Sequence, residues 1–138
     1  MREIITNSAA ETEKAGEWFA SFLKSGDIVA YKGGLGMGKT TFTRGLARGL
    51  GISMEVSSPT FSLINEYRGE KNRLCHMDAY RLSCTDDLLD TGFYDYIDSG
   101  WIAAVEWSET VELDAAYTVS FERLGDDIRR ITFEGGGI

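Results

Sequence analysis

The residues best suited to chemistry lie in one glycine-rich stretch, Gly33 to Thr41, which reads GGLGMGKTT. This stretch fits the pattern G-x-x-x-x-G-K-[ST], which is the phosphate-binding P-loop. Glycines let successive backbone N–H groups point into one concavity, and a helix that follows adds the positive end of its dipole. We therefore expect a nucleotide to bind here. The expected nucleotide-binding residues are Gly33, Gly36, Met37, Gly38, Lys39, Thr40 and Thr41.

Two side chains of this loop have separate expected tasks. Lys39 would neutralise the β and γ phosphates of ATP or ADP, and the Thr40 hydroxyl would ligate Mg²⁺. A glycine-rich turn with an exposed lysine is the structural alternative.

Two apolar stretches, Leu74 to Asp78 and Ile102 to Glu106, each end in an acid. In α/β sheets, ligands bind at the carboxyl ends of parallel strands, where an acid can reach Mg²⁺. We assign Glu106 to the metal, directly or through water, and Asp78 to orienting or deprotonating the attacking water; the reverse assignment stays open. A surface or capping carboxylate is the alternative for each.

A further catalytic candidate is Thr60, in the sequence Ser57-Ser58-Pro59-Thr60, which contains the single proline of the chain. Proline fixes the local backbone and holds the residue before it extended. Thr60 resembles a switch threonine that senses the γ-phosphate, and an ordinary turn threonine is the alternative.

The loop needs a strand before it and a helix after it, and the sequence predicts both. Asp27 to Lys32 is a short apolar run, and Thr40 to Leu50 has apolar residues at helical spacing before Gly51. Upstream, a short strand is expected at Glu3 to Thr6. The capping box formed by Ser8 and Glu11 then opens a helix that we expect to end at Gly26.

The sequence of the second half of the chain predicts two hairpins, with a helical segment and a buried strand between them. The predicted elements are a hairpin of Phe61 to Tyr67 with Arg73 to Met77, a helical segment Ser83 to Asp98 broken at Gly92, a buried strand Trp101 to Val105, and a hairpin of Ala116 to Leu124 with Ile128 to Phe133. The predicted fold is a single α/β P-loop NTPase domain spanning residues 1–138. Its mixed, mostly parallel central sheet has helices on both faces and antiparallel hairpin additions.

Composition limits the classes of partner. The 138-residue chain has 22 acidic and 14 basic residues and a net charge of -8, which disfavours strong direct binding of nucleic acid. We find no apolar run of membrane-spanning length and no apolar leader, so we expect a cytoplasmic protein. Cys75 and Cys84 are expected to be free thiols, and His76, the single histidine, excludes a metal site made of several histidines.

Other P-loop classes fit less well. A GTPase would need the guanine-reading pattern N-K-x-D, and the chain contains no Asn-Lys pair. A small-molecule kinase would need an arginine-bearing lid, whereas the single arginine pair, Arg129-Arg130, lies in a predicted strand. The kinase alternative is weakened but stays open.

Four motifs together resemble the bacterial TsaE (YjeE) family: GGLGMGKTT, SSPTF at 57–61, HMDAYRL at 76–82 and VEWSE at 105–109. The resemblance implies a Mg²⁺-dependent ATPase that is slow alone and stimulated by partner proteins. It also implies a role in making threonylcarbamoyladenosine next to the anticodon of tRNA. The implied partners are a threonylcarbamoyl-transferase subunit and its inactive paralogue, which the ATPase docks on and resets by hydrolysis, so that contact with tRNA is indirect.

The resemblance carries over residue by residue. It implies that Lys39 and Thr40 hold phosphate and metal, that Thr60 is the switch residue, and that Asp78 and Glu106 are the functional acids. Trp107 would neighbour the site, and Ser108 stands where the family often has proline. A different class of function, a nucleotide-gated assembly module without essential turnover, also remains open.

Overall fold

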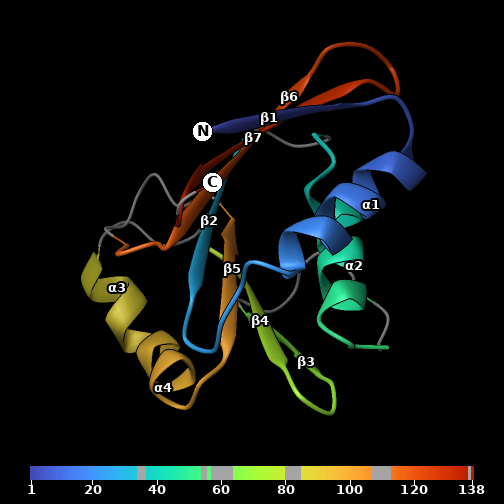
Figure 1. Cartoon of the computed structure of the whole chain (residues 1–138). Helices are drawn as coiled ribbons and strands as arrows, with labels where there is room; N and C mark the ends of the chain where they lie inside the picture. Colours follow the sequence, from blue (N-terminus) through green and yellow to red (C-terminus); the bar gives the residue numbers. More distant parts are fainter. Residues whose placement is uncertain (34–36, 54–55, 57–63, 80–84, 107–112, 137) are drawn as a thin grey trace.

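The computed structural model of the chain describes residues 1–33, 37–53, 56, 64–79, 85–106, 113–136 and 138. These residues form one sheet with helices on both faces (Figure 1). The strands are β1 (Arg2–Thr6), β2 (Ile28–Lys32), β3 (Ile64–Arg68), β4 (Arg73–Asp78), β5 (Ile102–Glu106), β6 (Tyr117–Arg123) and β7 (Arg129–Gly135). The helices are α1 (Ala9–Ala20), α2 (Lys39–Gly49), α3 (Thr85–Asp90) and α4 (Phe93–Asp98).

The sheet is parallel at its centre and antiparallel at its edges. Its strand order is β1-β7-β6-β2-β5-β4-β3. Strand β2 pairs in parallel with both β5 and β6, and β5 pairs in parallel with β4. The pairs β1–β7, β6–β7 and β3–β4 are antiparallel. The predicted mixed, mostly parallel sheet with hairpin additions is confirmed.

Helices cover the two faces of this sheet, and a separate apolar core lies under each. Helices α1 and α2 lie on one face, whereas α3 and α4 lie on the other (Figure 1). Because side chains alternate along a strand, Val29 and Tyr31 of β2 enter the core beneath α1 and α2, while Ile28 enters the core beneath α3 and α4. Every residue of β5 is buried, as expected for a strand covered on both faces.

Helices α1 and α2 pack very closely, and glycines make this possible. A Cβ on Gly45 of α2 would lie 1.8 Å from the Glu13 carbonyl oxygen of α1, and a Cβ on Gly16 would lie 2.1 Å from the Phe42 carbonyl oxygen. Both neighbours are backbone atoms, so neither can move aside like a flexible side chain. The glycines therefore allow the backbones of α1 and α2 to approach each other this closely.

One predicted boundary is wrong. The first helix ends at Ala20 rather than at Gly26. Beyond Ala20 the backbone continues in tighter turns, in which the N–H of Phe22 donates to the carbonyl of Phe19 and that of Leu23 to Ala20. As a result Phe22 is 36% exposed instead of lying in the core.

The other predicted elements within the described residues are confirmed to within a few residues, whereas 61–63 of the first predicted hairpin and 83–84 of the predicted helical segment lie outside those residues. In the part of the chain that the structure describes, no helix is both long and apolar enough to cross a membrane.

Candidate functional site

The predicted phosphate-binding loop leaves the carboxyl end of β2 and leads into α2. Gly33 follows β2 with φ 132°, and a Cβ there would lie 2.8 Å from the carbonyl oxygen of Phe121. Gly38 is the N-cap of α2 with φ 94°. Gly33 must be glycine because of its positive φ and the nearby Phe121 carbonyl oxygen. Gly38 must be glycine because of its positive φ. Residues 34–36 between them, which include Gly36, lie outside the described part of the chain.

Lys39, the first residue of α2, is a buried cation. Its side chain is only 5% exposed, and its Nζ donates to the Gly33 carbonyl oxygen at 2.9 Å. The same Nζ lies 3.5 Å from Oε1 of Glu106. A buried charge is costly unless it is paired, so this lysine depends on the loop carbonyl and the carboxylate around it. The exposed-lysine alternative is therefore wrong.

The two predicted acids lie side by side at the carboxyl ends of the neighbouring strands β4 and β5. Asp78 and Glu106 are direct partners in the parallel register of β4 and β5. Both follow the alternation of side chains that enter the core under α2, so they lie on the face that carries Lys39. In the predicted hairpin β4 is antiparallel to β3, but on its other side β4 runs parallel to β5. The hairpin therefore does not carry Asp78 to the opposite end of the sheet from Glu106. Glu106 is buried, and Asp78 is half-buried.

Sequence reasoning missed His76, which is fully buried beneath Glu106. Its Nε2 lies 2.6 Å from Oε2 of Glu106. This distance is within hydrogen-bonding range, so the imidazole and the carboxylate form a close, buried polar pair. A usable signal was present in the spacing, because His76 lies two residues before Asp78 and thus on the same face of a strand.

The charge state of Glu106 is set by competing effects. Burial raises the pKa of this carboxyl, but the His76 imidazole and the Lys39 ammonium lower it by more. The pKa of Glu106 therefore lies below its usual value. The ionised carboxylate is therefore favoured, and this form can accept a hydrogen bond from a cationic side chain or bind a metal ion.

A layer of buried hydroxyls supports the start of α2. The Thr43 hydroxyl donates to the Lys39 carbonyl oxygen at 2.7 Å, and the Tyr31 hydroxyl lies 2.9 Å from Thr43 Oγ1. Burial raises the pKa of the fully buried Tyr31, so its phenol stays protonated. The backbone of Lys39 is thereby tied to β2 by side chains as well as by the loop.

A second residue missed from the sequence is Arg129, which brings a guanidinium close to the loop. A Cβ on Gly38 would lie 3.7 Å from Arg129 Nε. The Nη1 of Arg129 donates to the carbonyl oxygens of Gly125, Asp126 and Ile128. One arginine of the predicted strand thus lies beside Gly38, a placement that the sequence alone did not suggest.

The remaining predicted site residues divide into two groups. Met37, Thr40 and Thr41 lie half-buried at the start of α2. Thr60, Trp107 and Ser108 lie outside the described residues.

The groups present fit a magnesium nucleotide. Within the described residues no three histidine, cysteine, aspartate or glutamate side chains gather as a preformed metal site. Mg²⁺ is commonly held by one or two carboxylates together with phosphate oxygens and water. A buried lysine, the Thr40 hydroxyl, the amino end of α2 and the carboxylates of Glu106 and Asp78 supply the donors and acceptors for that combination.

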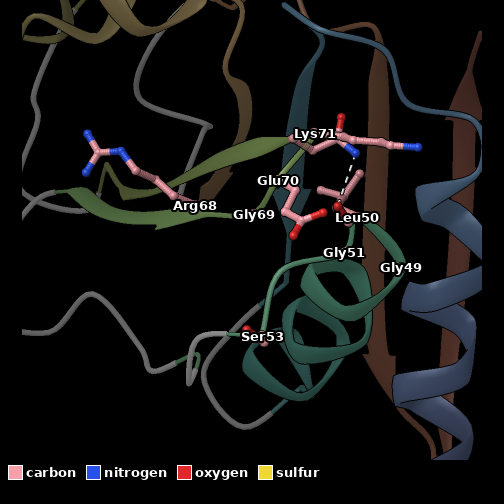
Figure 2. Close-up of a pocket in the computed structure, with 9 residues that line it drawn as sticks. Gly49, Leu50, Gly51, Ser53, Arg68, Gly69, Glu70 and Lys71 are labelled. Atoms are coloured by element: carbon pink, nitrogen blue, oxygen red, sulfur yellow. Dashed lines mark hydrogen bonds between the residues drawn. The ribbon is translucent and has the colours of Figure 1, made fainter.

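The described residues also show a cavity of about 570 Å³ at the opposite end of α2. Its lining runs from Gly49 to Gly51 and across the tip of the β3–β4 hairpin (Figure 2). The Asn72 side-chain amide donates to the Leu50 carbonyl oxygen at 3.1 Å, which joins the hairpin to the helix end. This cavity does not include Lys39 and is separate from the candidate site.

Comparison with known proteins gives a consistent result. A family model described as "Threonylcarbamoyl adenosine biosynthesis protein TsaE" matches residues 6–131. A relative from Bacillus subtilis (strain 168), named tRNA threonylcarbamoyladenosine biosynthesis protein TsaE, is 40% identical over 135 residues, which covers 96% of this chain and 84% of the relative. The protein with the same name from Treponema pallidum (strain Nichols) is 37% identical over 131 residues, covering 93% and 96%.

A solved structure is similar as well. The crystal structure of Bacillus subtilis YdiB matches with a TM-score of 0.77 and 36% sequence identity, covering 96% of this chain and 83% of that one.

Proposed function

Because the chain belongs to the TsaE family, we propose that it binds ATP or ADP with Mg²⁺ and hydrolyses ATP within the biosynthesis of threonylcarbamoyladenosine in tRNA. The observation that carries this proposal is the position of the Lys39 ammonium. It is buried at the amino end of α2, 2.9 Å from the Gly33 carbonyl oxygen and 3.5 Å from Glu106 Oε1. A cation held at a helix start beside a glycine loop is suited to a polyphosphate.

The residues around Lys39 have distinct proposed roles. Thr40 and Glu106 would hold Mg²⁺, which when bound neutralises charge that develops on the phosphates. Asp78 orients the attacking water and accepts its proton, since it lies beside Glu106 at the same strand ends. Exchange of the roles of the two acids remains the alternative assignment. Thr60 is proposed as the residue that senses the γ-phosphate.

The proposed partners are proteins rather than RNA. We propose docking on a threonylcarbamoyl-transferase subunit and its paralogue, with slow hydrolysis alone and faster hydrolysis in the complex. The net charge of -8 supports a division of labour in which another subunit binds the tRNA.

Isothermal titration calorimetry with ATP and ADP in magnesium buffer tests nucleotide binding. Lys39→Ala is expected to abolish the heat of binding, whereas Lys32→Ala, the exposed lysine at the end of β2, should leave it unchanged. An absence of binding by the wild-type chain, alone and with the partner proteins, would overturn the proposal.

A second experiment tests turnover within the pathway. A non-hydrolysable ATP analogue should support a single round of tRNA modification in the reconstituted system but not repeated rounds. Full multiple-turnover activity with the analogue would instead establish an assembly module that does not need hydrolysis.

A further inference from the structure

We propose that His76 is a positioning residue that orients the Glu106 carboxylate for its work at the nucleotide. The inference rests on the proposed function, because it concerns how one of the proposed acids is held. Its basis is that each oxygen of Glu106 has its own partner: Oε2 lies 2.6 Å from His76 Nε2, and Oε1 lies 3.5 Å from Lys39 Nζ. A carboxylate with both oxygens engaged cannot rotate freely about its last bond.

The sheet provides the space for this contact. In the register of β4 and β5, His76 lies opposite Ala104, and Glu106 is two residues further along the same face. A diagonal neighbour at that separation is within reach of a long side chain. Ala104 is fully buried and has only a methyl group, so the imidazole can extend over it toward Glu106.

The imidazole is itself held in place. Tyr31 of β2 and His76 of β4 approach each other across β5, with ring centroids 6.2 Å apart and an interplanar angle of 65°. His76 has no exposed surface, and Tyr31 is anchored through Thr43 to α2. Since its surroundings are packed, the histidine can act as a fixed contact rather than a mobile one.

Among the residues that the structure describes, loss of the His76 contact would leave the Glu106 carboxylate with the longer contact to Lys39. Residues that orient a metal-binding side chain typically contribute roughly 10- to 100-fold to activity or metal affinity. We expect His76→Leu to lower kcat within that range while nucleotide KM changes much less, because Lys39 and the loop remain.

The chain's single histidine makes the contact directly observable. The imidazole ¹⁵N signals of the nucleotide-free protein belong to His76 alone, so they can be followed without assignment. Glu106→Gln is expected to shift the Nε2 signal, whereas Glu122→Gln, at an exposed carboxylate on β6, should leave it unchanged. If the Nε2 chemical shift were the same in Glu106→Gln as in the wild type, the proposal would be overturned, whatever the activity of the variant.

Three substitutions at His76 separate positioning from packing. Gln can place an amide donor near the position of Nε2, whereas Asn is too short to do so, and Leu has no donor. We expect His76→Gln to restore a large part of the kcat that His76→Asn and His76→Leu lose. Leu74→Val is the matched control, because Leu74 is fully buried on the same face of β4 and has no contact of this kind with Glu106.

The outcomes distinguish this inference from the proposed function. If the wild-type chain binds and hydrolyses ATP but Gln is no better than Asn, with both variants folded and binding ADP, the positioning role is wrong and the proposed function stands. If Leu74→Val lowers kcat as much as His76→Leu, the effect is one of packing, and the positioning role is again wrong. If the wild-type chain itself does not bind nucleotide, the proposed function fails first.

Discussion

Asp78 and Glu106 face each other in the register of two parallel strands, β4 and β5. This relationship places two acids, which are 28 residues apart in the sequence, at the carboxyl ends of neighbouring strands. Both lie on the face of the sheet that carries Lys39. Their surroundings differ, because Glu106 is buried between His76 and Lys39 while Asp78 is half-buried. Two neighbouring carboxylates in different environments can take different roles in catalysis.

The difference between the acids predicts different kinetic defects. Asp78→Asn should lower kcat by about 10²- to 10⁴-fold, the usual contribution of a general base, while the affinity for ADP stays close to that of the wild type. Glu106→Gln should also lower kcat but should in addition weaken the Mg²⁺ dependence of nucleotide binding. Fluorescence titration with a labelled ADP at several Mg²⁺ concentrations measures the second effect. Equal Mg²⁺ dependence in the two variants would contradict the assignment of Glu106 to the metal.

Gly33 is predicted to be indispensable for nucleotide binding. Its φ of 132° and the Phe121 carbonyl oxygen, which would lie 2.8 Å from a Cβ, both exclude a side chain. Gly33→Ala should therefore displace the loop carbonyl that holds Lys39 and weaken ADP binding in calorimetry. Gly51→Ala is the control, because Gly51 has φ 79° at the other end of α2, and a Cβ there would meet no atom of the described residues within 4 Å. Both variants should lose stability through backbone strain, by about 1–3 kcal/mol. Only Gly33→Ala should lose affinity.

The loop and its lysine could be predicted from the sequence because the motif is contiguous. Gly33, Gly38 and Lys39 are close along the chain, so the strand, loop and helix that contain them follow from local patterns alone. The acids at the ends of β4 and β5 were also predictable, since each ends an apolar run. Their direct pairing was not, because register between strands depends on the whole sheet.

The contacts that sequence reasoning missed depend on side chains from distant segments. The His76–Glu106 contact joins residues 30 positions apart and requires a small side chain at Ala104 between them. The position of Arg129 beside Gly38 depends on how the β6–β7 hairpin returns to the loop. The early end of the first helix was missed for another reason, because the tighter turns after Ala20 keep nearly helical hydrogen bonding without extending the helix.

The buried pairing of Glu106 predicts a loss of stability in acid. The pKa of Glu106 is lowered in the folded state, so its contribution to stability is present above the usual value of 4.5 and is lost as the pH falls through the folded-state pKa. The free energy of unfolding, measured by urea denaturation from about pH 6 to about pH 3 without Mg²⁺ or nucleotide, should fall less steeply in Glu106→Gln than in the wild type. Glu122→Gln, at an exposed carboxylate, should follow the wild type more closely. Parallel curves for the wild type and Glu106→Gln would contradict this account.

The close contact of α1 and α2 predicts that Gly45 cannot be replaced by alanine without loss of stability. Alanine in a helix interior is favoured over glycine by about 1 kcal/mol, which alone would stabilise α2. A Cβ on Gly45 would, however, lie 1.8 Å from the Glu13 carbonyl oxygen, so the two helices must separate. We expect Gly45→Ala to be destabilised by about 1–3 kcal/mol, measured as a lower urea midpoint. In Gly125→Ala the nearest atom is the flexible end of Ile128 at 3.4 Å, so a change within about 0.5 kcal/mol is expected.

The Cys75 thiol is predicted to be unreactive toward alkylating reagents in the native protein. It is a free thiol with no exposed surface, and burial, opposed in part by a backbone hydrogen bond and assisted by the charge of Glu66, raises its pKa to about 12. Because the thiolate is the reactive form, its population at about pH 8 is roughly a thousandfold smaller than in an ordinary thiol, and burial also blocks the reagent. Iodoacetamide should therefore leave Cys75 unmodified in the native state and alkylate it in urea, as measured by mass spectrometry of the peptide that contains it. Alkylation of Cys75 at the same rate in the native and the unfolded protein would show that β4 opens readily, and would contradict the rigid placement of His76 beside it.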